Sequence, residues 1–116
     1  MRLSTDDLPM FFDETHAALA SRLKELAPKL NEAESGSDAE VVEEMARGNL
    51  FELVCAAKID TRSLCLAREM LGYVSPRADS ILAVQGLGVQ PILLAGTDEQ
   101  KRHVQAVARG IRAGRQ

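Results

Sequence analysis

The chain has 116 residues, a net charge of −3 and 46% hydrophobic residues, which fits one folded domain. The hydrophobic content excludes a disordered chain. A β-sandwich is disfavoured because aromatic residues make up only 3% and tryptophan is absent. We therefore expect an all-α fold over residues 1–116, an orthogonal or up-down bundle of five to six helices with a core of Leu, Ala, Val and Ile.

The first amphipathic stretch runs from Asp6 to Leu30. Its apolar residues recur at helical spacing and form one stripe: Leu8, Phe12, Leu19, Leu23, Leu26 and Leu30. Thr5 or Asp6 is the expected N-cap. Pro28 is expected to end or kink this helix, because the residue before a proline is pushed away from helical angles.

A polar connector, residues 32–38, leads to a shorter helix. Ser37 or Asp38 is its expected N-cap, and Gly48 is expected to close it. Its inward side chains are expected to be Val41, Val42 and Met45. The apolar run of residues 50–57 is assigned to a helix, although eight residues do not distinguish a helix from a strand by period alone.

A further helix is predicted behind Asp60 or Thr61 as the N-cap. Its apolar positions are Leu64, Leu66, Ala67, Met70, Leu71 and Val74. Ser75 and Pro76 then start another helix, because a proline in the first helical position gives up no intrahelical hydrogen bond. We expect this helix to stop at a turn formed by residues 86–88, which read Gly-Leu-Gly.

A short apolar helix is predicted for residues 89–95, and its composition suggests that it is buried on most sides. Gly96 is expected to end it in the left-handed conformation. Thr97 and Gln100 form a capping box for the last helix, whose first turn carries the acidic residues Asp98 and Glu99.

These last segments resemble a known family. The stretch LGVQPILLAGTDEQKRH, followed by VARG, and the earlier stretch DTRSLCLAREMLGY are similar to the N-terminal domain of acyl-CoA dehydrogenases. These flavoenzymes oxidise acyl-CoA thioesters. The resemblance covers the second half of the chain well and the first half in outline. Residues 50–59 depart from it, because they lack the proline and glycine residues common there in the family.

The resemblance implies a role for the helix that precedes the Gly-Leu-Gly turn. In the family this helix forms one wall of the acyl-chain pocket. The matching residues here are Asp79, Ser80, Ala83, Val84 and Leu87. Gly86 and Gly88 would let the backbone approach a ligand closely. The alternative is that all these residues belong to the helix core. Asp79 and Ser80, if they line a pocket, suggest a short, branched or polar acyl group.

The resemblance also implies that the flavin site and the catalytic base are supplied by other polypeptide. In the family FAD is held mainly by a β-domain that follows, and the base that removes the α-proton is a carboxylate in a C-terminal helical domain. Neither the β-domain nor the C-terminal domain is represented in residues 1–116. We therefore expect an acyl-CoA dehydrogenase function in the full-length enzyme, with no FAD tightly bound to this chain alone and no activity of the isolated chain.

A helical protein–protein interaction module is the alternative function. An apolar face left uncovered favours self-association, so a homo-oligomer is expected. The five basic residues that close the chain, Lys101, Arg102, Arg109, Arg112 and Arg115, suit the negative end of a helix dipole. A nucleic-acid partner is not favoured, because these residues form a tail and aromatic residues for base stacking are few.

The remaining signals suggest a cytoplasmic protein without a membrane span. The longest uncharged run is interrupted by glycine, glutamine and proline, and no targeting segment is recognised at the start. Cys55 and Cys65 lie in apolar helical runs and are expected to be buried free thiols, as in a reducing compartment. His16 and His103 have no partners at metal-ligand spacing and are expected to be structural or solvated.

Overall fold

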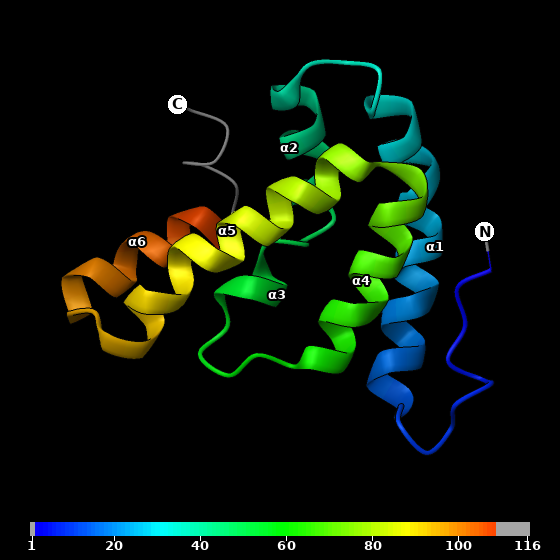
Figure 1. The fold of residues 1–116 in the computed structure, drawn as a ribbon, viewed down its shortest axis with the longest axis horizontal. Coiled ribbons are helices and arrows are strands. Elements are labelled where there is room, and N and C mark those ends of the chain that lie inside the picture. The colour runs from blue at the N-terminus through cyan, green and yellow to red at the C-terminus, as the bar shows by residue number, and fades with distance from the viewer. Residues whose placement is uncertain (1, 109–116) are drawn as a thin grey trace.

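The computed structural model describes residues 2–108, and within them the chain is all-helical. Six helices follow one another along the chain (Figure 1): α1 (Glu14–Ala33), α2 (Asp38–Arg47), α3 (Glu52–Cys55), α4 (Thr61–Val74), α5 (Pro76–Ala95) and α6 (Asp98–Ala108). The predicted all-α fold class and helix number are confirmed. The basic residues Arg109, Arg112 and Arg115 lie outside the described part of the chain.

Helix α1 begins eight residues later than predicted. Its N-cap is Asp13, whose side chain accepts hydrogen bonds from the backbone N–H groups of Thr15 and His16. The assignment of Thr5 or Asp6 as the cap was wrong, and Leu8 lies in the exposed segment before the helix. That segment contains Pro9, which disfavours helical angles at the residue before it.

Pro28 does not end α1, which continues to Ala33. The buried residues Ala27 and Leu30 flank the proline, and α1 packs against α2 and α4. This packing outweighs the backbone cost of an interior proline. The predicted stripe is confirmed at Leu19, Leu23 and Leu30, which are buried.

The second helix matches its prediction, whereas the third is much shorter than expected. Ser37 caps α2 by accepting a hydrogen bond from the N–H of Glu40, and Gly48 is the C-cap. The next residue, Asn49, has a φ of 58°. Of the predicted helix at residues 50–57, only the single turn Glu52–Cys55 forms.

The cap of α4 and the junction between α4 and α5 confirm the prediction. Asp60 caps α4 by accepting a hydrogen bond from the N–H of Arg62. Ser75 separates the two helices, and its side chain accepts a hydrogen bond from the N–H of Ala78. Pro76 occupies the first turn of α5.

Helix α5 is continuous from Pro76 to Ala95, so the predicted turn at residues 86–88 was wrong. Each interior glycine costs about 1 kcal/mol relative to alanine, and an interior proline costs about 3 kcal/mol. Packing offsets this cost, because the buried residues Ala78, Leu82 and Val89 hold one side of α5 against its neighbours. Residues 89–95 are not buried on most sides: Pro91, Leu94 and Ala95 are exposed.

Gly96 ends α5 for a different reason from the predicted one. Its φ of −76° is not left-handed. A Cβ atom at this position would lie 2.5 Å from the carbonyl oxygen of Ile92, so the residue must be glycine for steric reasons. The predicted capping box of α6 is confirmed, with hydrogen bonds from Thr97 N to Gln100 Oε1 (2.9 Å) and from Gln100 N to Thr97 Oγ1 (3.2 Å).

The two cysteines differ in exposure. Cys55 is buried, and desolvation together with the nearby Glu52 carboxylate raises the pKa of its thiol to about 11. Cys65 lies on the exposed side of α4, which corrects the expectation that both thiols are buried.

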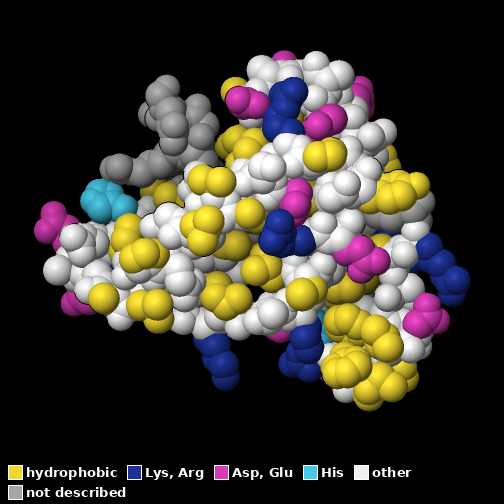
Figure 2. All heavy atoms as spheres, viewed as in Figure 1, with side chains coloured by type: hydrophobic (Ala, Val, Ile, Leu, Met, Phe, Trp, Pro, Cys, Tyr) yellow, Lys and Arg dark blue, Asp and Glu magenta, His cyan; other side chains and the backbone are white. Residues whose placement is uncertain are grey.

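The molecule is a thin slab with apolar side chains on its surface. Its principal extents are 42 × 35 × 17 Å, so its shortest dimension is less than two helix diameters. Figure 2 shows many hydrophobic side chains on one face, including the region of α5. A slab this thin does not enclose a helix on all sides, and Val84, Leu87 and Leu94 of α5 remain 62–76% exposed.

Candidate functional site

An apolar groove lies between α4 and α5, and Val54 of α3 also lines it. Its volume is about 320 Å³. Helices α4 and α5 join at Ser75 and diverge from that point (Figure 1). Side chains from both helices line the groove. The lining side chains are mainly apolar: Val54, Ile59, Leu64, Arg68, Leu82, Ala83, Gly86, Leu87 and Gln90.

An ion pair connects the two walls of the groove. Arg68 of α4 donates from Nε to Asp79 Oδ1 at 2.8 Å and from Nη2 to Asp79 Oδ2 at 3.1 Å. Two parallel hydrogen bonds of this kind fix the geometry of the pair. The hydrogen bonds to Asp79 and the charge of its carboxylate hold the pKa of Arg68 above its ordinary value.

The five residues matched to the family's pocket wall lie on one side of α5. Ala83 and Leu87 line the groove. Asp79 stands on the same face, since residues four apart share a face of a helix, and its carboxylate is occupied by Arg68. Ser80 and Val84 occupy the adjoining exposed face. Their role toward an acyl group stays a prediction.

The two glycines of α5 meet different surroundings. A Cβ atom at Gly86 would stand 3.3 Å from Cγ1 of Val54, so glycine lets α5 pack closely on α3. Nothing lies within 4 Å of the corresponding position at Gly88. Close packing between helices therefore accounts for Gly86, and the prediction that both glycines admit a ligand is untested.

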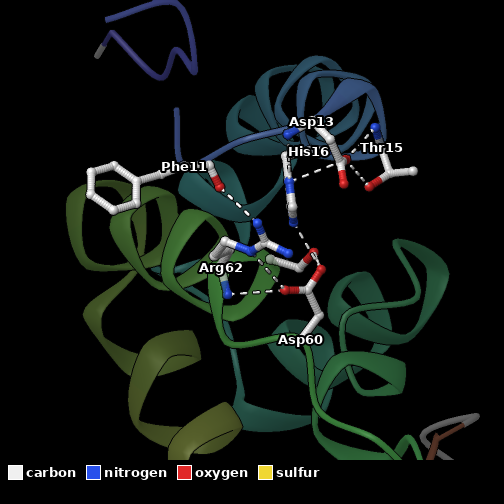
Figure 3. A network of polar contacts seen from close by, with 7 residues as sticks. Phe11, Asp13, Thr15, His16, Asp60 and Arg62 are labelled. Carbon is white, nitrogen blue, oxygen red and sulfur yellow. Dashed lines mark hydrogen bonds and ion pairs between the residues drawn. The ribbon is translucent and has the colours of Figure 1, made fainter. Parts of the chain in front are cut away.

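A polar cluster, the His16 network, joins α1 to the start of α4 (Figure 3). It consists of Asp13, His16, Asp60, Arg62 and Ser63. The His16 side chain is fully buried. Its Nδ1 accepts a hydrogen bond from the backbone N–H of Asp13 at 3.0 Å, so the proton of the neutral ring is on Nε2. Nε2 then donates to Asp60 Oδ2 at 2.8 Å.

Asp60 holds several donors at the start of α4. Its carboxylate accepts from Ser63 Oγ at 2.9 Å as well as from His16. These two hydrogen bonds lower the pKa of Asp60 from 3.8 to about 2, and the bond from His16 contributes most. Arg62 donates to the carbonyl oxygen of Phe11 at 3.0 Å, which ties the segment before α1 to the same cluster.

The His16 network does not have the geometry of a catalytic triad. Ser63 donates to Asp60 rather than to His16, and the second ring nitrogen of His16 is occupied by a backbone N–H. Among residues 2–108, no group of three or more His, Cys, Asp and Glu side chains is arranged to hold a metal ion. The expectation that His16 is structural agrees with this geometry, and His103 is exposed.

The network was missed at the sequence level. A local signal was present, since Asp13 and His16 have the three-residue spacing of a capping box. The partner of His16 is Asp60, the N-cap residue of α4, which is 44 residues away along the chain, and no local pattern identifies it.

Helix α5 has the length and composition of a membrane span. In the described part of the chain it is the one helix with these properties. Its apolar stretch has a mean hydropathy of 1.4, and 17% of the residues in that stretch are buried. Length and hydropathy do not distinguish a span from a helix whose outer face is covered by other protein. The sequence-based expectation of no membrane span stays a prediction.

Comparison with known proteins identifies the family. The family model described as "Acyl-CoA dehydrogenase, N-terminal domain" matches residues 5–110, which is most of the chain. Searches of curated proteins and of solved structures gave no match. The all-helical fold agrees with the helical nature of that domain. The chain belongs to the acyl-CoA dehydrogenase family, in which it corresponds to the N-terminal domain.

Proposed function

We propose that this chain forms one wall of the acyl-binding pocket of a flavin-dependent acyl-CoA dehydrogenase. The observation that carries the proposal is the apolar groove, because two of the residues matched to the family's pocket wall, Ala83 and Leu87, line it. Ligand pockets are concave, mostly apolar and at least about 300 Å³ in volume. The substrate of the complete enzyme would be an acyl-CoA thioester.

The groove does not have the donors that a dinucleotide cofactor requires. FAD carries a pyrophosphate, which proteins bind with backbone N–H groups at helix N-termini or with basic side chains. Arg68 and Gln90 are the polar side chains of the groove, and Arg68 already binds Asp79. The groove therefore does not fit FAD as a tight ligand, and we propose that the cofactor is held by other polypeptide.

The groove also lacks a free carboxylate. A general base must lie within hydrogen-bond reach of the proton that it removes. The groove-lining residues include no acid, and the neighbouring Asp79 is paired with Arg68. We propose that the isolated chain does not dehydrogenate acyl-CoA, and that flavin and base come from domains or partner chains outside residues 1–116.

Measurements of FAD retention and of turnover test whether the flavin and the base come from other polypeptide. The purified chain would be mixed with excess FAD, passed through gel filtration and examined for flavin absorbance. It would then be assayed with octanoyl-CoA and an artificial electron acceptor. We expect neither retained flavin nor turnover. A stoichiometric yellow complex after gel filtration would overturn the proposal.

Methyl NMR tests the pocket wall directly. Octanoyl-CoA should shift the methyl signals of Ala83, Val84 and Leu87, while those of Val104 and Val107 on α6 should stay in place. Coenzyme A without an acyl group is the matched control and should leave the first set unshifted. Shifts confined to residues outside α4 and α5 would contradict the proposal.

One observation also favours the alternative, a helical interaction module. Leu87 and Leu94 are 76% and 75% exposed, and exposed apolar patches mark interaction surfaces. Both functions require a partner polypeptide on this side of α5.

We also propose that the protein is located in the reducing cytoplasm. The two free thiols, Cys55 and Cys65, support this proposal.

A further inference from the structure

The N-terminal loop, residues 6–12, is attached to the His16 network where it enters α1 (Figure 3). Arg62 donates to the carbonyl oxygen of Phe11 at 3.0 Å. The ring of Phe12 packs edge-on against the ring of His16, with 5.6 Å between the ring centroids. The backbone N–H of Asp13 donates to Nδ1 of His16 at 3.0 Å. Three consecutive residues therefore hold the end of the loop, and two of the three contacts are made with His16.

His16 occupies a position that usually carries Glu or Gln at the start of a helix. In a capping box, the side chain three residues after the N-cap accepts a hydrogen bond from the backbone N–H of the N-cap residue, here Asp13. A glutamine keeps its acceptor at every pH, whereas both nitrogens of a protonated imidazole are donors. Histidine is also the side chain that ordinarily gains its proton between about pH 8 and about pH 5. The hydrogen bond that closes this capping box therefore depends on pH.

The charged groups around His16 determine which contact protonation breaks. Nε2 donates to Asp60 in either state of the ring, so α1 stays joined to the start of α4. Nδ1 lies 3.2 Å from Oδ1 of Asp13, so this carboxylate is in reach of the additional proton. The backbone N–H of Asp13 then faces a second donor and loses its acceptor. The remaining charged group, Arg62, lies 3.7 Å from Asp60.

We propose that His16 is a pH-sensitive switch that holds the end of the N-terminal loop while its ring is neutral and releases it on mild acidification. The loop carries three exposed apolar side chains, those of Leu8, Met10 and Phe11, which are 47%, 72% and 57% exposed. Leu3, on the other side of the loop, is fully buried in the core. Acidification therefore frees an apolar surface segment at one end without opening the core. This inference does not depend on the groove between α4 and α5.

NMR spectroscopy of the wild-type chain from about pH 8 to about pH 5 tests the switch. The ring nitrogen shifts of His16 report its protonation. As the ring gains its second proton, the hydrogen-exchange protection factor of the Asp13 amide should fall roughly fivefold or more, since its hydrogen bond is lost. The heteronuclear NOE values of Met10 and Phe11 should fall with the same midpoint. The signals of Val104, which is buried on α6, should not change.

The variant His16→Gln removes the titration and keeps the hydrogen-bonding groups. Glutamine accepts from the N–H of Asp13 through Oε1 and donates to Asp60 through Nε2 at every pH. The loop signals of this variant should be independent of pH over the same range. The matched control is His103→Gln, since His103 is the other histidine and is exposed on α6. This control should keep the wild-type transition.

Several results would overturn the switch, and the wild-type titration alone can give two of them. The ring of His16 could stay neutral while the chain remains folded, or it could gain a proton without any change at Asp13, Met10 and Phe11. A loop transition that persists in His16→Gln would assign the pH dependence to another group. A change at Val104 with the same midpoint would indicate that the whole chain unfolds. The proposed pocket wall would stand or fall independently of these results.

Discussion

Asp60 connects the segment around α1 to the start of α4. Its carboxylate caps α4 and accepts hydrogen bonds from the buried His16 and from Ser63. The cap was predictable because it depends on an acidic residue directly before a helical pattern. The bond to His16 was not, since it requires the packing of α1 against α4.

The lowered pKa of Asp60 predicts a pH-dependent contribution to stability. A carboxyl group whose pKa is depressed by folding stabilises the native state above its unfolded pKa, and this contribution is lost as the pH falls toward the folded value. For Asp60 the window runs from about 3.8 down to about 2. We expect Asp60→Asn to lower the free energy of unfolding by about 1 kcal/mol near neutral pH, a modest value because the carboxyl is half-exposed.

Urea denaturation at a series of pH values measures this effect. The difference between wild type and Asp60→Asn should shrink as the pH falls through the window, because the wild type loses the contribution that the variant lacks. Glu69→Gln on the same helix is the control, since Glu69 is exposed and has no polar partner within residues 2–108. A difference that stays constant down to pH 2 would contradict the assignment.

At the scale of elements, sequence patterns predicted which segments are helical and most of the N-caps. They did not predict the helix ends correctly where packing opposed a local signal. Ser37, Asp60 and Thr97 were identified as caps or candidate caps because capping depends on residues within one turn. The helix does not end at Pro28, and the turn expected at residues 86–88 does not form. In both helices buried residues adjoin the proline or glycine, and their packing outweighs the local preference.

The continuity of α5 predicts that Pro91 destabilises the native chain. An interior proline removes one backbone hydrogen bond and crowds the preceding turn. Pro91 is exposed, so its replacement leaves no cavity. We expect Pro91→Ala to raise the free energy of unfolding by about 1 kcal/mol or more.

Pro76 is the matched control for this substitution. It occupies the first turn of the same helix, where proline is favoured, so Pro76→Ala should be neutral or slightly destabilising. Thermal and urea denaturation of both variants measure the effect. If the two variants changed stability alike, or if Pro91→Ala were destabilising, the chain would not form a continuous helix at residue 91.

At the scale of the whole molecule, the arrangement of the helices explains why only one wall of the candidate site could be predicted from the sequence. The resemblance gave the side of α5 on which Asp79, Ala83 and Leu87 lie. It did not reveal the opposite wall, because Leu64 and Arg68 of α4 reach the groove through the angle between two helices. That angle depends on the packing of α4 against α1 and of α5 against α3.

The same arrangement leaves apolar side chains on α5 that require a partner. Without another polypeptide, the exposed side chains of Val84 and Leu94 should bring copies of the chain together. We expect the wild-type chain to self-associate in sedimentation equilibrium, and Val84→Glu/Leu94→Glu to weaken this association at least roughly tenfold. Leu87 is left intact because it lines the groove.

Met10→Glu provides the control for general surface hydrophobicity. Met10 is 72% exposed, as much as the α5 residues, but lies in the segment before α1. If α5 is the contact surface, this variant should associate like the wild type, because the added charge is away from the interface. Equal weakening by both variants would indicate non-specific association. A wild-type chain that stays monomeric over a wide concentration range would show that the exposed face of α5 does not bind a second copy.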